Sequence, residues 1–330
     1  MNQGSFNLIR YVIILAVFTS CALGARGQVN PRTVGTVSNV KPTACPAGFA
    51  NQAACSTAVV SCPDVADIGV TFGLTPGVSG TIVSINGTGG TEPGGGPFSG
   101  YVEAGFSIAQ FAFGSPWEDG GDILASACRP ATMLDFFHSS HPGKPYCAQG
   151  ASAGAAALGY ALSWYGLETQ LANVEMIVGP VLTNIQEGCE VPQIAPVTIT
   201  PTNGLPFSDA PQFFAEAEMV SKWTGQQCLP SGGSSSSANG SWAAQSIFQT
   251  GALLNYGTRL AGWGCDNGLN PSSAQSYLFF SEVTSPWTWT RLSDCTGAEG
   301  VSTAVTPQGV KSSIAITSDM LAQCVKPSKE

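Results

Sequence analysis

The stretch "CAQGASAGAAALGYAL", Cys147–Leu162, decides the fold of this 330-residue chain. It joins a short segment with strand character, 144–149, to an Ala- and Leu-rich helical run, 152–166, that a glycine closes. At the junction Ser152 stands in a Gly-x-Ser-x-Gly frame, whose glycines remove side chains where strand and helix crowd together. A serine at the tip of such a turn, beside the N–H groups that begin a helix, is typical of a nucleophile.

Strand and helix patterns alternate on both sides of this junction. Such alternation predicts an α/β fold, a mostly parallel twisted sheet with helices on both faces. The expected strands are 67–74, 80–85, 106–113, 144–149, 173–181, 258–264 and 287–295, and the expected helices are 122–138, 152–166, 272–283 and 305–324.

The first residues have the pattern of an export signal. Arg10 precedes an apolar run of 13 residues, 11–23, which is too short to span a bilayer as a helix. We therefore predict a signal peptide over 1–27, no transmembrane segment, and a secreted or periplasmic protein. The alternative is a lipoprotein cut before Cys21, where Phe18 takes the place of the expected small aliphatic residue.

Cysteine usage agrees with export. The chain has 11 cysteines, and removal of Cys21 leaves an even number, which predicts five disulfides. Cys265–Cys295 and Cys189–Cys228 are the local pairings we expect. No Cys-x-x-Cys pair is present and histidine is scarce, so no metal site is predicted, and no cofactor is expected.

Composition divides the mature chain further. Residues 28–63, rich in Pro, Ala, Cys and Thr, are expected to form an irregular N-terminal segment pinned by disulfides. Residues 64–330 then form the main domain. Within it the alternation breaks at about 185–256, where Pro-rich turns, aromatic residues and the loop "SGGSSSSANG" predict a lid.

The charge of the chain excludes one class of partner. Charged residues make up only 10% of the sequence, the net charge is −9, and no basic cluster is present. Nucleic-acid binding depends on such clusters, so it is not expected. The sequence does not indicate an oligomeric state.

At Ser152 and the strand-end loops the chain resembles the α/β-hydrolase superfamily, especially exported esterase- or lipase-like members, over residues 64–324. The resemblance implies an oxyanion loop at 86–90, "NGTGG", where N–H groups of Thr88 or Gly89 would join that of Ala153 to hold a tetrahedral oxyanion. It also implies a small apolar ester or acyl ligand.

The rest of the family's triad is matched only in part. The acid of the family falls on Asp266 in "GWGCDNG", with Asp294 and Glu282 as alternatives. The family's histidine belongs in the loop "SDCTGAEGVSTAVTPQG", 293–309, which has none; Glu299 or Gly300 stands there instead.

Histidine is scarce elsewhere too. The chain's two histidines, His138 and His141, follow a predicted helix and precede the nucleophile strand. We therefore expect both at the opposite end of the sheet from Ser152, as solvated loop residues.

Several functions remain open. Ser152 without a base is a poor nucleophile, which would leave a binding or weakly active protein on a hydrolase scaffold. Glu299 could instead act as base with Asp266 at acidic pH, because neighbouring carboxylates share a proton. A third possibility is a ligand pocket under the lid, lined by Trp117. A secreted adhesion module would instead show antiparallel hairpins and no helix after Ser152.

Overall fold

The structure is a computed structural model. It describes residues 31–142, 144–179, 185, 198–199, 207–208, 244–249, 251–265, 279–280, 283–295 and 303–324. The predicted signal peptide, most of the predicted lid, Cys21, Cys189, Cys228, Asp266, Glu282, Glu299 and Gly300 lie outside these residues.

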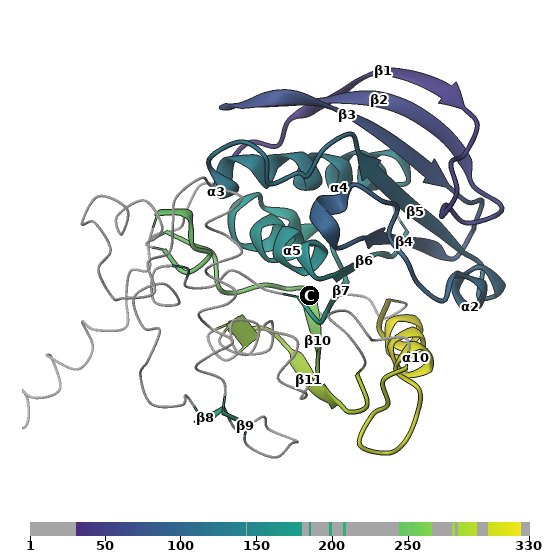
Figure 1. Cartoon of the computed structure of the whole chain (residues 1–330), viewed down its shortest axis with the longest axis vertical. Coiled ribbons are helices and arrows are strands. Elements are labelled where there is room, and N and C mark those ends of the chain that lie inside the picture. Colours follow the sequence, from purple (N-terminus) through teal and green to yellow (C-terminus); the bar gives the residue numbers. More distant parts are fainter. Residues whose placement is uncertain are drawn as a thin grey trace, which may run out of the picture. The chain divides into compact units, whose positions relative to one another are not determined.

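A nine-stranded sheet organises the domain, in the order β1-β2-β3-β5-β4-β6-β7-β10-β11 (Figure 1). The six strands from β5 to β11 are parallel, and β1, β2 and β3 join them antiparallel at one edge. The nine strands are β1 (Thr36–Thr43), β2 (Ala54–Cys62), β3 (Val65–Leu74), β4 (Gly80–Ile85), β5 (Phe106–Phe113), β6 (Tyr146–Ala151), β7 (Asn173–Ile177), β10 (Arg259–Cys265) and β11 (Trp287–Leu292). A separate pair consists of β8 (Thr198–Ile199) and β9 (Phe207–Ser208).

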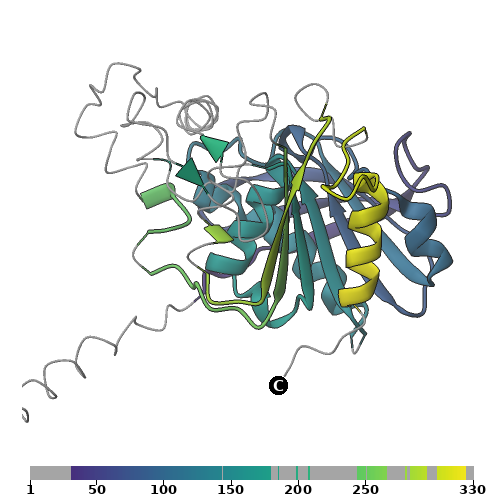
Figure 2. The same ribbon diagram turned by 90° about the horizontal axis from the view of Figure 1, so that it is seen from below.

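Helices cover both faces of the parallel strands. α4 and α5 contact one face, and α2 and α10 contact the other, where α10 runs along the strands (Figure 2). The helices are α2 (Phe98–Glu103), α3 (Ile123–Ser126), α4 (Cys128–Ser140), α5 (Ala153–Trp164) and α10 (Ser312–Cys324), with short 3₁₀ turns η1 (Thr88–Gly90) and η2 (Leu167–Thr169). This confirms the predicted fold class, a mostly parallel sheet with helices on both faces.

The sequence explains why these elements lie in the centre. Every residue of β4 and β7 is buried, as expected for parallel strands covered on both faces. Every residue of α5 is buried as well, because this helix is apolar on all sides. The segment 244–249 packs against it, since its backbone carbonyls accept hydrogen bonds from Tyr160 and Trp164 of α5.

The order of the strands creates a crevice. β4 lies between β5 and β6. After β4 the chain forms β5 on one side of it, and then returns past β4 to form β6 on the other side. The connections after β4 and β6 start on opposite faces, with α2 after one and α5 after the other. In open α/β sheets, ligands bind beyond the carboxyl ends of the strands at such a switch point.

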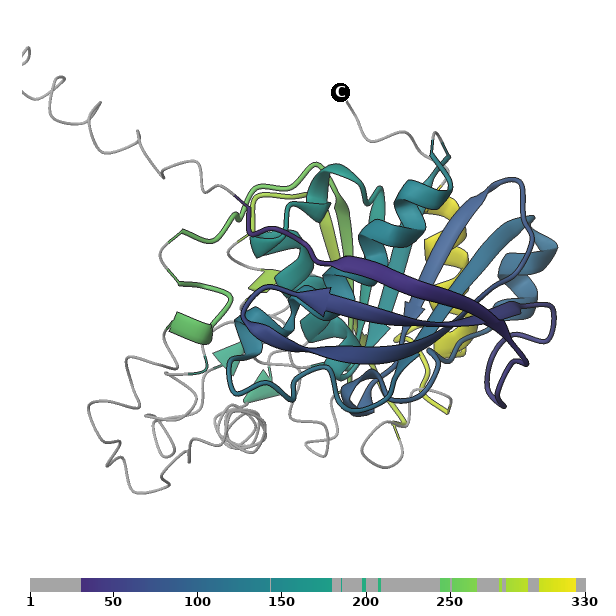
Figure 3. The ribbon, with the colours of Figure 1, turned by 90° about the horizontal axis from the view of Figure 1, so that it is seen from above.

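The N-terminal segment corrects one prediction. Residues 28–63 were expected to be irregular, but they contain β1 and β2, which extend the sheet beyond β3 (Figure 3). β1 is almost wholly exposed and contains a proline, so its own sequence carries no strand pattern. Pairing with β2 and the Cys45–Cys55 disulfide hold it in place.

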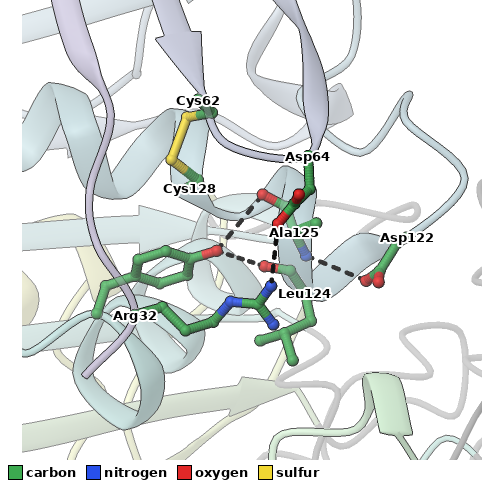
Figure 4. Close-up of polar contacts among 8 residues, drawn as sticks. Arg32, Cys62, Asp64, Asp122, Leu124, Ala125 and Cys128 are labelled. Atoms are coloured by element: carbon green, nitrogen blue, oxygen red, sulfur yellow. Dashed lines mark hydrogen bonds and ion pairs between the residues drawn. A yellow bond between two sulfur atoms is a disulfide. The ribbon is translucent and has the colours of Figure 1, made fainter. Parts of the chain in front are cut away.

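Further contacts fasten this segment to the helical layer (Figure 4). Cys62 forms a disulfide with Cys128 at the start of α4, and Arg32 lies 3.9 Å from Asp64 in an ion pair. Nearby, Asp122 caps α3 by accepting a hydrogen bond from the N–H of Ala125. The helix predicted over 122–138 is thus two helices with a capped beginning.

Four disulfides lie within the described ranges: Cys45–Cys55, Cys62–Cys128, Cys147–Cys324 and Cys265–Cys295. The last confirms the predicted local pairing, whereas Cys189–Cys228 stays a prediction. Cys147–Cys324 fixes the end of α10 to the middle of the sheet. In the part of the chain that the structure describes, no helix has the length and apolar character needed to cross a membrane.

Of the four described disulfides, the ones that close the longest and the shortest loop of chain allow a test of how much each stabilises the fold. Cys147–Cys324 has a sequence separation of 177 and Cys45–Cys55 one of 10. Loop-closure entropy in the unfolded chain makes the longer bridge worth about 5 kcal/mol and the shorter about 3 kcal/mol. Urea unfolding of the two double Cys→Ser variants should therefore show the larger loss for Cys147/Cys324. A larger loss for Cys45/Cys55 would contradict this account.

Candidate functional site

Ser152 lies at a strained turn between β6 and α5. Its φ of 50° and ψ of −121° fall outside the regions that serines ordinarily adopt. Although it occupies the N-cap position of α5, its side chain does not cap the helix. The half-buried hydroxyl therefore remains available at the carboxyl end of β6, in the strand–turn–helix setting of a nucleophile elbow.

Two glycines make this turn possible. A Cβ atom added to Gly150 would lie 2.4 Å from the carbonyl oxygen of Gly154, and one added to Gly154 would lie 2.5 Å from the carbonyl oxygen of Ile85. Both contacts are with backbone atoms, which cannot move aside as a flexible side chain can. The Gly-x-Ser-x-Gly frame is thus a steric requirement of this packing.

The end of β7 packs against the same turn. The N–H of Ser152 donates to the carbonyl of Ile177, and a Cβ on Gly179 would lie 2.5 Å from the carbonyl oxygen of Ser152. Val178 between them has a φ of 38°, which is a rare backbone conformation for a β-branched residue. Backbone strain at Ser152 and at the adjacent Val178 marks this place as a functional candidate.

A cavity of about 430 Å³ opens beside Ser152 at the switch point between β4 and β6. Its walls are mostly apolar with a few polar groups, which is the usual character of a small-molecule site. The lining residues are Asn86, Gly95, Gly96, Pro97, Gln149, Ala151, Ser152, Ile177, Val178, Ser313 and Ile316.

The predicted oxyanion residues Thr88 and Gly89 form the 3₁₀ turn η1, and neither is among the lining residues. The carbonyl of Gly89 accepts a hydrogen bond from the N–H of Trp117, and a Cβ on Gly89 would lie 2.5 Å from Pro116. This turn packs on the loop after β5, whereas Gly95 and Gly96 of the same glycine-rich segment face the cavity. Ala153 is the first residue of α5 and is buried.

Trp117, the predicted pocket residue, is fully buried and is not among the residues that line this cavity. Its carbonyl accepts a hydrogen bond from Arg129 of α4, which also binds the carbonyls of Asp119 and Ala66. Next to it, burial raises the pKa of Glu118 to about 8. The buried Arg129 side chain thus holds the loop after β5 in place.

Both histidines lie far from Ser152. The ring of His138 lies 5.2 Å from that of Tyr146, the first residue of β6, and Nδ1 of His141 lies 3.4 Å from the carbonyl oxygen of Phe137 in α4. Ser152 follows the other end of this strand, and six residues of strand span on the order of 20 Å. The imidazoles are therefore at the amino end of β6, as predicted. His138 is not the solvated loop residue expected, because it lies in the last turn of α4 and is half-buried.

Of the predicted acids, the structure describes Asp294. Asp266 and Glu299 lie outside the described residues, as does Glu282. The Cys265–Cys295 disulfide joins the ends from which those two segments start, because Cys265 ends β10 and Cys295 follows β11 by three residues. Asp294 has a φ of 57°, which is typical of a turn, and does not line the cavity.

Sequence reasoning missed the contribution of α10. Ser313 and Ile316, one helical turn apart, form part of the cavity wall. Sequence separation hides this contact, and only a correct pairing of Cys147 with Cys324 would have indicated that α10 lies against β6. Among the described residues, no cluster of His, Cys, Asp or Glu has the composition to hold a metal ion.

The chain is similar in overall path to several solved hydrolases. One is Est1E from Butyrivibrio proteoclasticus, with 9% sequence identity, a match over 82% of this chain and 99% of that one, and a TM-score of 0.46. Another is acetyl xylan esterase from Paenibacillus sp. R4, with 13% identity, a match over 87% of this chain and 89% of that one, and a TM-score of 0.46. A third is dienelactone hydrolase from Anabaena variabilis, with 11% identity, a match over 83% of this chain and 97% of that one, and a TM-score of 0.44. No protein-family model matches the sequence, and no curated protein matches it. The fold assignment rests on the strand order above.

The crowding at the elbow predicts the effect of one added methyl group. Gly154→Ala should lower the free energy of unfolding by about 1–3 kcal/mol, because its Cβ meets the backbone of β4. Gly69→Ala, at an exposed position of β3, is the control, since a Cβ there meets nothing within 4 Å. Urea unfolding compares the two variants, and equal stability of both would contradict the packing described.

The raised pKa of Glu118 predicts that the free energy of unfolding depends on pH. Its folded pKa of about 8 exceeds the ordinary 4.5, so its contribution to stability is complete below pH 4.5 and is lost as the pH rises to 8. Glu118→Gln should therefore gain stability relative to wild type between pH 4.5 and 8. Thermal unfolding at several pH values measures this gain, with exposed Glu103→Gln as control. A constant difference between Glu118→Gln and wild type would contradict the burial of a neutral acid.

Proposed function

We propose that this α/β-hydrolase-fold protein binds a small carboxylic ester or acyl group in the cavity beside Ser152 and hydrolyses it slowly or not at all. The strained position of Ser152 carries this proposal. A hydroxyl held at φ 50° on a crowded turn, facing a mostly apolar cavity, fits a group that meets a ligand.

The chemistry of the site limits the rate we expect. Attack by Ser152 Oγ on an ester carbonyl requires a base to take the hydroxyl proton, and the ester's alcohol then leaves. Both imidazoles lie at the other end of β6, so neither is positioned to take this proton. Without a base, the remaining acceleration over water is about 10³- to 10⁴-fold, supplied by binding and by hydrogen bonds to the oxyanion.

The disulfides support a place of action outside the reducing cytosol. Four bridges join described residues, and one of them crosses the middle of the sheet. Structural disulfides of this kind form and persist in oxidising compartments. We therefore propose a secreted or periplasmic protein, in agreement with the signal peptide predicted over 1–27.

Reaction with a fluorophosphonate tests the proposed role of Ser152. Wild type should be labelled slowly at a single site, and Ser152→Ala should not be labelled, as measured by intact mass and peptide mapping. Ser313→Ala is the control, because its hydroxyl shares the same cavity wall. Labelling of Ser152→Ala at the rate of wild type would contradict the proposal.

A second candidate function is hydrolysis with a carboxyl base. The Cys265–Cys295 bridge favours it, because it joins the starting points of the segments that contain Asp266 and Glu299. Glu299 would accept the proton of Ser152, with Asp266 as its partner, and paired carboxyl groups of this kind keep one proton at acidic pH.

This second candidate predicts an acidic pH optimum. Hydrolysis of p-nitrophenyl butyrate should rise as the pH falls from 8 to about 5 and should be lost in Glu299→Gln and in Ser152→Ala. Glu103→Gln, an exposed carboxyl on α2, is the control. Activity in Glu299→Gln equal to that of wild type would exclude the carboxyl base and leave the slow or non-hydrolytic function.

A further inference from the structure

A row of buried polar side chains crosses the sheet just below the cavity. Ser84 in β4 is in register with Gln110 in β5 on one side and with Gln149 in β6 on the other. All three are at most 3% exposed, which is unusual for uncharged polar side chains without a structural or functional task. Each lies close to the carboxyl end of its strand.

These side chains bind the glycine-rich segment that lines the cavity. Gln110 Nε2 donates to the carbonyl of Gly94 at 2.6 Å. Ser84 Oγ at 2.9 Å and Gln149 Nε2 at 3.2 Å both donate to the carbonyl of Gly95. Two consecutive carbonyls are therefore turned toward the sheet.

Peptide geometry then fixes the direction of two N–H groups. In a trans peptide the N–H points opposite to the carbonyl of the preceding residue. The N–H groups of Gly95 and Gly96 consequently both point away from the polar row. Both residues are exposed and line the cavity, and no acceptor for either N–H is found among the described residues. Successive N–H groups on one side of the chain form a concave site that suits an anion.

At two positions the glycine-rich segment has no room for a side chain. A Cβ on Gly94 would lie 2.2 Å from the carbonyl oxygen of Ser84, and one on Gly96 would lie 2.6 Å from Nε2 of Gln149. Tyr101 completes the arrangement, because its hydroxyl donates to Gln149 Oε1 at 2.7 Å and so leaves the amide nitrogen of Gln149 to serve as donor.

We propose that Gln110 and Gln149 are positioning residues that aim the N–H groups of Gly95 and Gly96, respectively, at the cavity, where these groups bind the carbonyl oxygen of an ester beside Ser152. This inference takes its ligand, a carboxylic ester, from the proposed function. It assigns the oxygen site to Gly95 and Gly96 and not to Thr88 and Gly89, whose turn packs on the loop after β5.

The first test measures fluorophosphonate labelling of Ser152. Gln149→Met should lower the maximal labelling rate by about 10²-fold, because donors to the developing oxyanion lose their alignment. The reagent concentration that gives half-maximal rate should stay the same. Tyr146→Phe is the control: it removes a buried hydroxyl hydrogen bond at the amino end of the same strand and leaves the donors to Gly95 in place. A Gln149→Met rate within threefold of wild type would overturn the positioning role while the proposed function stands.

The second test does not depend on Ser152 chemistry. Sodium butyrate supplies a carboxylate on a short apolar chain, and amide NMR shifts report which N–H groups bind it. Gly95 and Gly96 should shift saturably in wild type and in Ser152→Ala, and Gly96 should lose its shift in Gln149→Met. Shifts at Thr88 and Gly89 instead, or a shift at Gly96 that is unchanged in Gln149→Met, would overturn the proposal even where labelling fails altogether.

Discussion

Close backbone contact around Ser152 is the constraint on which the rest of the structure depends. The turn after β6 approaches the end of β4 so tightly that a methyl group at Gly154 would lie 2.5 Å from a carbonyl oxygen. The end of β7 closes on the same turn from the other side through Gly179. The strained conformation of Ser152 persists because buried strands on both sides hold the turn.

The second feature is an interior that uses neutral polar groups near the site. The row of Gln110, Ser84 and Gln149 continues in register to Glu175 of β7, a fully buried acid. Burial raises the pKa of Glu175 well above its usual range, and the nearby Asp319 adds to this shift. Among the described residues that line the cavity none carries a charge, so a ligand there meets dipoles of the protein, which suits a neutral, polar group such as an ester.

Much of this fold could be predicted from the sequence, and the exceptions have physical causes. β4 and β5 were predicted to the residue, because buried parallel strands appear as continuous apolar runs between glycines. β1 was not, since its pairing partner and not its own pattern holds it. The final helix begins at Ser312 and not at 305, because a turn with Gly309 at φ 75° precedes it. The elbow at Ser152 was predicted from local glycine spacing. The orientation of the Gly95 carbonyl could not be predicted, because it depends on a hydrogen bond from Gln149, which is 54 residues away in the sequence.

A crystal structure of the protein with a covalent phosphonate would test the central claim most directly. The account predicts density continuous with Ser152 Oγ, the phosphoryl oxygen within hydrogen-bonding distance of the N–H groups of Gly95 and Gly96, and both imidazoles still at the amino end of β6. An adduct at another residue, an oxygen bound by the Gly89 turn, or a histidine ring beside Ser152 would contradict it.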